Sequence, residues 1–113
     1  MKIYHNPRCS KSRQTLALIQ ENTSDFEIIK YLEDPLSFND IKLLLTKLNV
    51  SPIKIVRTKE KIWKENFKSK KIDDNEIIKI LAKNPKLMER PIVETNNKAI
   101  VGRPPENVLE LFN

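Results

Sequence analysis

The chain opens with the pattern of a strand, a helix and a second strand, and this order constrains its fold more than any other feature. Residues 1–5 are suited to a short strand and end at the turn-forming pair Asn6-Pro7. Residues 10–21 are typical of a helix, and residues 26–31 are rich in strand-forming side chains. A strand–helix–strand unit of this spacing predicts a parallel strand pair and an α/β fold.

The middle of the chain is predicted to be helical. Residues 37–40 resemble a capping box, and the apolar residues that follow recur at helical spacing: Ile41, Leu44, Leu45 and Leu48. Residues 53–67 are also expected to be helical, and Asp73-Asp74 begins a further helix before a short helical turn at Asn84-Pro85.

The C-terminal part predicts two strands joined by a turn, and then a helix. Residues 92–95 and 99–101 are expected to be the strands, with Asn96-Asn97 as the hairpin turn. Gly102, the only glycine, indicates a sharp turn or a close approach of two backbones. The last helix is expected to begin at Pro104-Pro105.

Composition excludes several classes of protein. No apolar run approaches the length of about 20 residues that spans a membrane, and one cysteine cannot form an internal disulfide, so we expect a cytoplasmic protein. The net charge of +6 permits nucleic-acid binding, a preference for anions, or a Lys-rich composition without functional meaning. Nucleic-acid binding is not expected, because the basic cluster at residues 68–71 has no interleaved aromatic side chains.

Cys9 is the candidate nucleophile. It lies between the first strand and the first helix, where free backbone N–H groups and the helix dipole stabilise a thiolate and attract an oxyanion. A buried structural cysteine is the alternative, but the neighbours Arg8, Ser10, Lys11 and Arg13 are all polar. Reactive cysteines are found in exposed, electropositive surroundings of this kind.

Two polar residues near Cys9 are candidates for supporting roles. His5 could stabilise the thiolate as imidazolium or transfer a proton, and a structural role at the end of the strand is the alternative. Ser12 completes a Cys-x-x-Ser spacing and could hydrogen-bond the sulfur or only cap the helix. With no second cysteine, an outside thiol must release any covalent adduct of Cys9. One Cys and one His are too few for a zinc site, so no metal is expected.

Three arginines further along the chain are candidates for binding an anion. Lysine outnumbers arginine here, and arginine holds oxyanions with a fixed fork that lysine lacks. Arg90 precedes a proline, and Arg103 lies between the single glycine and a pair of prolines; Arg57 lies in the ambiguous helical segment. A surface salt bridge is the alternative for each.

Four segments together resemble the glutaredoxin-linked arsenate reductase family. The first is residues 3–13, Ile-Tyr-His-Asn-Pro-Arg-Cys-Ser-Lys-Ser-Arg, and the others follow in the family's order at residues 31–35, 90–93 and 102–106. The resemblance implies one thioredoxin-like domain over residues 1–113, with a mixed sheet and a helical insertion at about residues 37–85. It also implies a cis Arg90-Pro91 bond beside the thiol.

The resemblance also implies a reaction. Cys9 would attack arsenate held by Arg57, Arg90 and Arg103, glutathione would attack the adduct as co-substrate, and glutaredoxin would reduce the mixed species so that arsenite leaves. His5 and Ser12 match residues that support the thiolate, and Arg13 matches the helix residue beside it. A cytoplasmic monomer without a bound cofactor is expected.

Two other functions are compatible with the sequence. One is a regulator of the Spx type that contacts RNA polymerase, although those proteins usually have Cys-x-x-Cys and Ser12 argues against them. The other is a glutathione-dependent thiol reductase with a substrate other than arsenate.

Overall fold

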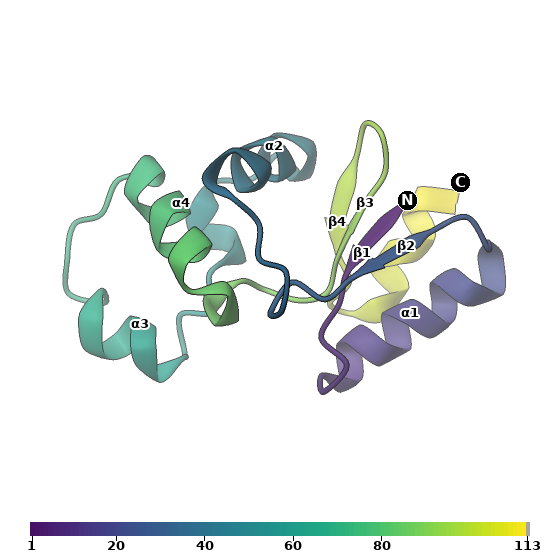
Figure 1. Cartoon of the computed structure of the whole chain (residues 1–113), viewed down its shortest axis with the longest axis horizontal. Helices are drawn as coiled ribbons and strands as arrows, with labels where there is room; N and C mark the ends of the chain where they lie inside the picture. The colour runs from purple at the N-terminus through teal and green to yellow at the C-terminus, as the bar shows by residue number, and fades with distance from the viewer. Residues whose placement is uncertain (113) are drawn as a thin grey trace. The chain divides into compact units, whose positions relative to one another are not determined.

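The computed structural model describes residues 1–112 (Figure 1). Within these residues the chain forms two compact units. Residues 1–34 and 90–112 form the first unit, and Pro35–Glu89 form the second. The helical insertion expected at residues 37–85 falls inside the second unit. None of the helices in residues 1–112 is long and apolar enough to cross a membrane.

The first unit contains a mixed sheet of β1 (Lys2–Tyr4), β2 (Glu27–Ile29), β3 (Ile92–Glu94) and β4 (Ala99–Val101). Its order is β2-β1-β3-β4, with β1 parallel to β2 and antiparallel to β3, and β3 antiparallel to β4. This confirms the predicted parallel pair and the α/β fold. β2 is shorter than residues 26–31, because Glu33 and Asp34 donate backbone hydrogen bonds to the Lys30 carbonyl and form a turn.

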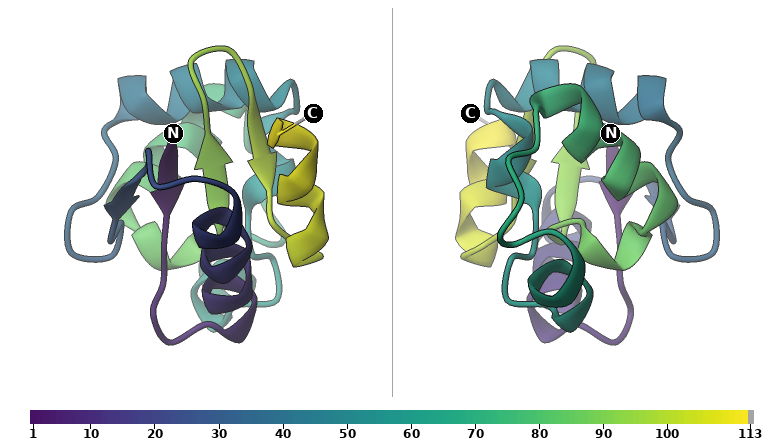
Figure 2. Two further views of the ribbon diagram at one scale, coloured as in Figure 1. Left: turned by 90° about the vertical axis from the view of Figure 1, so that its right-hand side faces the viewer. Right: turned by 90° about the vertical axis from the view of Figure 1, so that its left-hand side faces the viewer.

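Two helical segments pack against one another beside this sheet, α1 (Ser10–Asn22) and η3 (Pro105–Phe112), shown in purple and yellow in Figure 2. Their shared core contains Ile3, Ile19, Val93 and Val108, all with no exposed surface. Leu16 is partly buried against this core, and Ala17 is exposed. The buried residues of α1 are Ser12, Thr15 and Ile19.

The Arg90-Pro91 bond is cis, as the resemblance implied, and so is Arg103-Pro104. Gly102 lies beside the first of these segments, since its N–H donates to the Pro91 carbonyl at 2.9 Å. A Cβ at Gly102 would lie 2.6 Å from Thr15 Oγ1 and 2.9 Å from Pro91 Cγ. The φ angle of Gly102 is not positive, so its backbone conformation does not require glycine. Glycine is required because the neighbouring side chains leave no room for a Cβ atom.

Gly102→Ala is therefore expected to lower the free energy of unfolding by about 1–3 kcal/mol, because the added methyl group overpacks a closed contact. Urea denaturation monitored by circular dichroism measures this change. Thr15→Ala removes two of the three atoms that the methyl group meets, so the double variant should lose less stability than the two single variants summed. Strict additivity would show that the contact with Thr15 is not the cause.

The second unit contains α2 (Phe38–Leu48), η1 (Pro52–Ile55), α3 (Lys61–Asn66), α4 (Asp74–Lys83) and η2 (Pro85–Leu87). The capping box that begins α2 is confirmed, because Ser37 accepts from the Asp40 N–H and Asp40 accepts from the Ser37 N–H. Asp73 likewise caps α4 by accepting from the Glu76 N–H at 2.8 Å.

The expectation of a helix through residues 53–67 is wrong in its middle. Val56 pairs with Met88 in an isolated antiparallel bridge, flanked by hydrogen bonds from the Arg57 N–H to the Leu87 carbonyl and from the Glu89 N–H to the Ile55 carbonyl. This pairing with a distant segment uses backbone groups that a continuous helix would need, so α3 begins only at Lys61.

Candidate functional site

Cys9 is the N-cap residue of α1, so its side chain lies where the helix presents free N–H groups. A tight turn holds it there, because the Cys9 N–H donates to the Asn6 carbonyl at 3.0 Å and the Arg8 N–H donates to Asn6 Oδ1 at 3.0 Å. Cys9 is neither fully buried nor fully exposed. The site therefore presents a thiol at a helix start, as the sequence predicts.

The surroundings of Cys9 favour its thiolate. Burial raises the pKa of the thiol, but the backbone N–H groups of Ser12 and Lys11, the charge of Arg90 and a hydrogen bond from Arg103 outweigh it, so the net pKa is lowered. The contribution of Ser12 comes from its backbone N–H. These groups would equally favour the negative charge of a bound oxyanion.

Arg103 connects Cys9 with the segment before the cis-proline. Its Nη1 lies 3.7 Å from Cys9 Sγ and donates to the Arg90 carbonyl at 3.2 Å. Two arginines from the far end of the chain thus act on the thiol, one through a hydrogen bond and one through its charge. The resemblance implied that both arginines act at Cys9, although no local pattern in the sequence places them there.

The buried pair of His5 and Ser12 lies behind the turn. His5 Nδ1 and Ser12 Oγ are 2.6 Å apart, and Ser12 Oγ also accepts from the Asn6 N–H at 3.0 Å. Burial, together with the charges of Lys30 and Arg13, holds the pKa of His5 below its ordinary value of 6.5. The neutral imidazole therefore predominates at pH 7. This disfavours the role in which His5 stabilises the thiolate as an imidazolium.

Thr15 is a buried polar residue that the sequence analysis did not single out. Its hydroxyl donates to the Lys11 carbonyl at 2.9 Å and lies 3.3 Å from the Gly102 carbonyl. It therefore joins α1 to the residue immediately before Arg103. The signal in the sequence was weak: Thr15 lies four positions before the core residue Ile19, so both share one helix face.

The other two candidate arginines have partners within their own units. Arg13 donates from Nη1 to the Pro7 carbonyl at 2.9 Å and so holds the turn before Cys9. Arg57, in the second unit, contacts Glu60 Oε1 at 2.6 Å and donates to the Lys86 carbonyl at 3.0 Å. The substrate-binding roles of Arg13 and Arg57 stay predictions.

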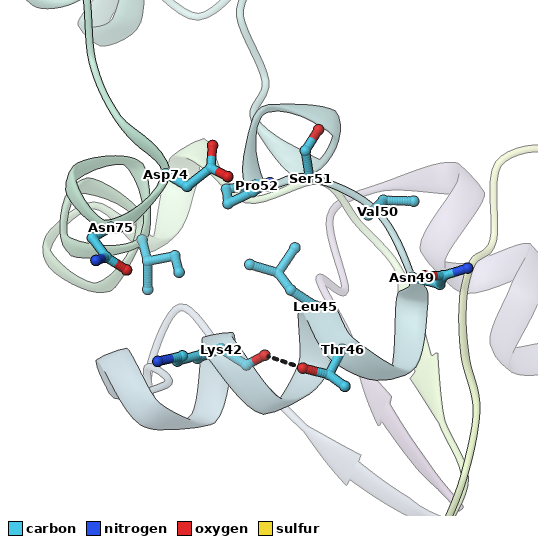
Figure 3. A pocket seen from close by; sticks show the side chains of 10 residues that line it. Lys42, Leu45, Thr46, Asn49, Val50, Ser51, Pro52, Asp74 and Asn75 are labelled. Atoms are coloured by element: carbon cyan, nitrogen blue, oxygen red, sulfur yellow. Dashed lines mark hydrogen bonds between the residues drawn. The ribbon is translucent and has the colours of Figure 1, made fainter.

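A hollow of about 530 Å³ lies in the second unit, between α2 and α4. Figure 3 shows the side chains that line it. Lys42 and Thr46 lie on its α2 side, and Asp74 and Asn75 on its α4 side. No cysteine or histidine lines it. Within residues 1–112, no three His, Cys, Asp or Glu residues are grouped so that they could hold a metal ion.

The lowered pKa of Cys9 predicts an alkylation rate that reaches half its maximum below pH 8.5, the approximate midpoint for an unperturbed cysteine. Only the thiolate reacts, so the rate rises with pH through the pKa of the folded protein and then levels off. Iodoacetamide labelling followed by mass spectrometry gives the profile, and the urea-unfolded chain is the control. Identical midpoints for the folded and unfolded chain would contradict the electrostatic description of the site.

A mixed sheet in the order β2-β1-β3-β4, with a cysteine at the helix start after β1 and a cis-proline before β3, defines a thioredoxin-like protein. The model of the ArsC family matches residues 4–111, and the chain belongs to this family.

Relatives of the chain are similar to it in sequence over nearly its whole length. The Escherichia coli (strain K12) protein named Uncharacterized protein YfgD is 47% identical over 113 residues, which cover 98% of this chain and 95% of that one. The arsenate reductase of Neisseria meningitidis (strain DSM 15465 / Z2491) is 40% identical, covering 96% of this chain and 94% of its own. The solved structure of the arsenate reductase from Vibrio cholerae has a TM-score of 0.91 and 44% identity, with 97% of each chain covered.

Proposed function

We propose that the protein is an arsenate reductase in which the Cys9 thiolate attacks arsenate and an external thiol completes the reaction. The observation that carries the proposal is the position of Cys9 at the start of α1 with Arg103 Nη1 3.7 Å from its sulfur. Relatives named arsenate reductases, at 40% identity or more, support arsenate as the oxyanion.

The first step forms a bond between Cys9 Sγ and arsenic, and one arsenate oxygen leaves as water after protonation. Arg103 and Arg90 would balance the negative charge of arsenate and thiolate, which otherwise repel each other. Neutral His5, through its hydrogen bond with Ser12, would hold the turn that carries Cys9.

The later steps need electrons that Cys9 alone cannot supply. Glutathione would attack the arsenic adduct and displace a second hydroxyl as water. Glutaredoxin or a second glutathione would then take the first glutathione as a disulfide, leaving As(III) on Cys9 for hydrolysis to arsenite. The sum is arsenate plus two thiols giving arsenite, one disulfide and water, so the two electrons come from the two thiols.

The test is arsenate-dependent oxidation of NADPH in the presence of glutathione, glutaredoxin and glutathione reductase. Turnover above the rate without protein supports the proposal, and a folded protein with no turnover with any thiol system contradicts it. A parallel assay with thioredoxin and thioredoxin reductase decides between the two electron donors. Faster turnover with thioredoxin would overturn the assignment of glutathione and glutaredoxin while preserving arsenate reduction.

A further inference from the structure

A hollow of about 310 Å³ in the first unit lies next to the turn that carries Cys9. Residues 5–8 form one wall, at the end of β1 and in the loop before α1, and Lys30, Leu32 and Glu33 form the other, in the turn after β2. Its volume is at the lower end of the range of about 300–1,000 Å³ found for small-molecule sites.

The walls of this hollow carry charges of both signs. Arg8 and Lys30 are cations, Glu33 is a carboxylate, and Leu32 adds an apolar side chain that is 45% exposed. At the floor is His5, which is only 6% exposed and is held by Ser12. Lys30 lines the hollow, and its positive charge acts on the His5 ring.

Glutathione has the complementary set of charges. At neutral pH it carries two carboxylates and one ammonium group, which match two cations and one carboxylate on the walls. It also carries the thiol that the single-cysteine reaction needs. Arg8 both lines the hollow and directly precedes Cys9, so the hollow adjoins the turn that carries the thiol.

We propose that the hollow formed by residues 5–8, Lys30, Leu32 and Glu33 is the binding site for glutathione. The inference rests on the proposed function, because it gives the external thiol of that reaction a location. Lys30 and Arg8 bind the two carboxylates, Glu33 binds the ammonium group, and the thiol is directed to the adduct on Cys9.

Binding is measured by an NMR titration with S-methylglutathione, which keeps the charges but has no thiol to react with Cys9. His5 is the only histidine, so its ring proton gives one unambiguous signal at the floor of the hollow. We expect saturable shifts of this signal and of the Lys30, Leu32 and Glu33 amides. Saturable shifts confined to other residues, or no saturable shift, would overturn the proposal.

Variants separate this site from the arsenate site. Lys30→Gln should raise both the Kd for S-methylglutathione and the KM for glutathione about five-fold, the effect of losing one partly exposed charged contact. The KM for arsenate should be unchanged. Lys98→Gln, an exposed lysine on the β3–β4 hairpin, is the matched control and should behave as the wild type.

The outcomes distinguish the two proposals. Arsenate turnover with glutathione but no saturable shift at residues 5–8 and 30–33 would overturn the binding site and leave the reductase assignment. Saturable binding there without arsenate turnover would support the site and overturn the reductase assignment. A rise in the KM for arsenate equal to that for glutathione in Lys30→Gln would show a general electrostatic effect and contradict the inference.

Discussion

Cys9→Ser is expected to reduce arsenate-dependent turnover by about 10⁴-fold or more, because the nucleophile that forms the bond to arsenic is lost. A serine hydroxyl is almost entirely protonated near neutral pH and is a much weaker nucleophile than a thiolate. The measurement is the coupled NADPH assay with saturating arsenate and glutathione. Residual turnover within ten-fold of the wild type would contradict a covalent role for Cys9.

The fold should survive this substitution, which makes the result interpretable. Cys9 occupies the N-cap of α1, and serine is among the residues that helices prefer at this position. We therefore expect the same circular dichroism spectrum and an unfolding midpoint no lower than that of the wild type. If the variant is both inactive and destabilised, alkylation of Cys9 in the wild-type protein tests the catalytic role instead. Alkylation should abolish turnover, and bound arsenate should slow the alkylation.

Arg103→Lys is expected to lower kcat/KM for arsenate by about 100-fold, although the positive charge is kept. Arg103 Nη1 contacts both Cys9 Sγ and the Arg90 carbonyl, at 3.7 and 3.2 Å, and the guanidinium has further N–H groups for an oxyanion. A lysine ammonium cannot reproduce this fork. The pH at half-maximal alkylation of Cys9 should also rise, because a hydrogen bond that favours the thiolate is lost.

Arg57→Lys is the matched comparison for that variant. The Arg57 guanidinium is already bound to Glu60 and to the Lys86 carbonyl within the second unit. A loss of kcat/KM equal to that of Arg103→Lys would support the predicted role of Arg57 in holding arsenate. An unchanged kcat/KM for Arg57→Lys would contradict that role, and an unchanged value for Arg103→Lys would contradict the anion site proposed beside Cys9.

Local patterns in the sequence correctly predicted most of the elements and the position of Cys9 at a helix start. The lone cysteine after a strand and before a helix is a local arrangement, so neighbouring residues alone indicate a stabilised thiolate. The capping box at Ser37 and the cap at Asp73 are likewise contacts between residues three apart. Such contacts depend on backbone geometry over a few residues, which the sequence specifies directly.

The errors arose where distant segments meet. Residues 53–67 have helical residues, but Val56 pairs with Met88, and that competition is invisible in a local window. Thr15 was overlooked because its importance comes from the Gly102 carbonyl, 87 positions later. The sequence indicated that Gly102 serves either a sharp turn or a close approach, and only the packed structure shows that it serves the close approach.

The sequence by itself determined that the lone cysteine lies between a strand and a helix and that the chain has no second cysteine, because these are facts of residue type and local position. Only the tertiary structure decided what surrounds the thiol. The cis-proline segment and the lone glycine bring Arg90 and Arg103 to Cys9, while Ser12 turns its hydroxyl to His5 and gives the sulfur only its N–H. The contact between Arg103 and Cys9 spans 94 positions of the chain, and no local pattern in the sequence carries information about it.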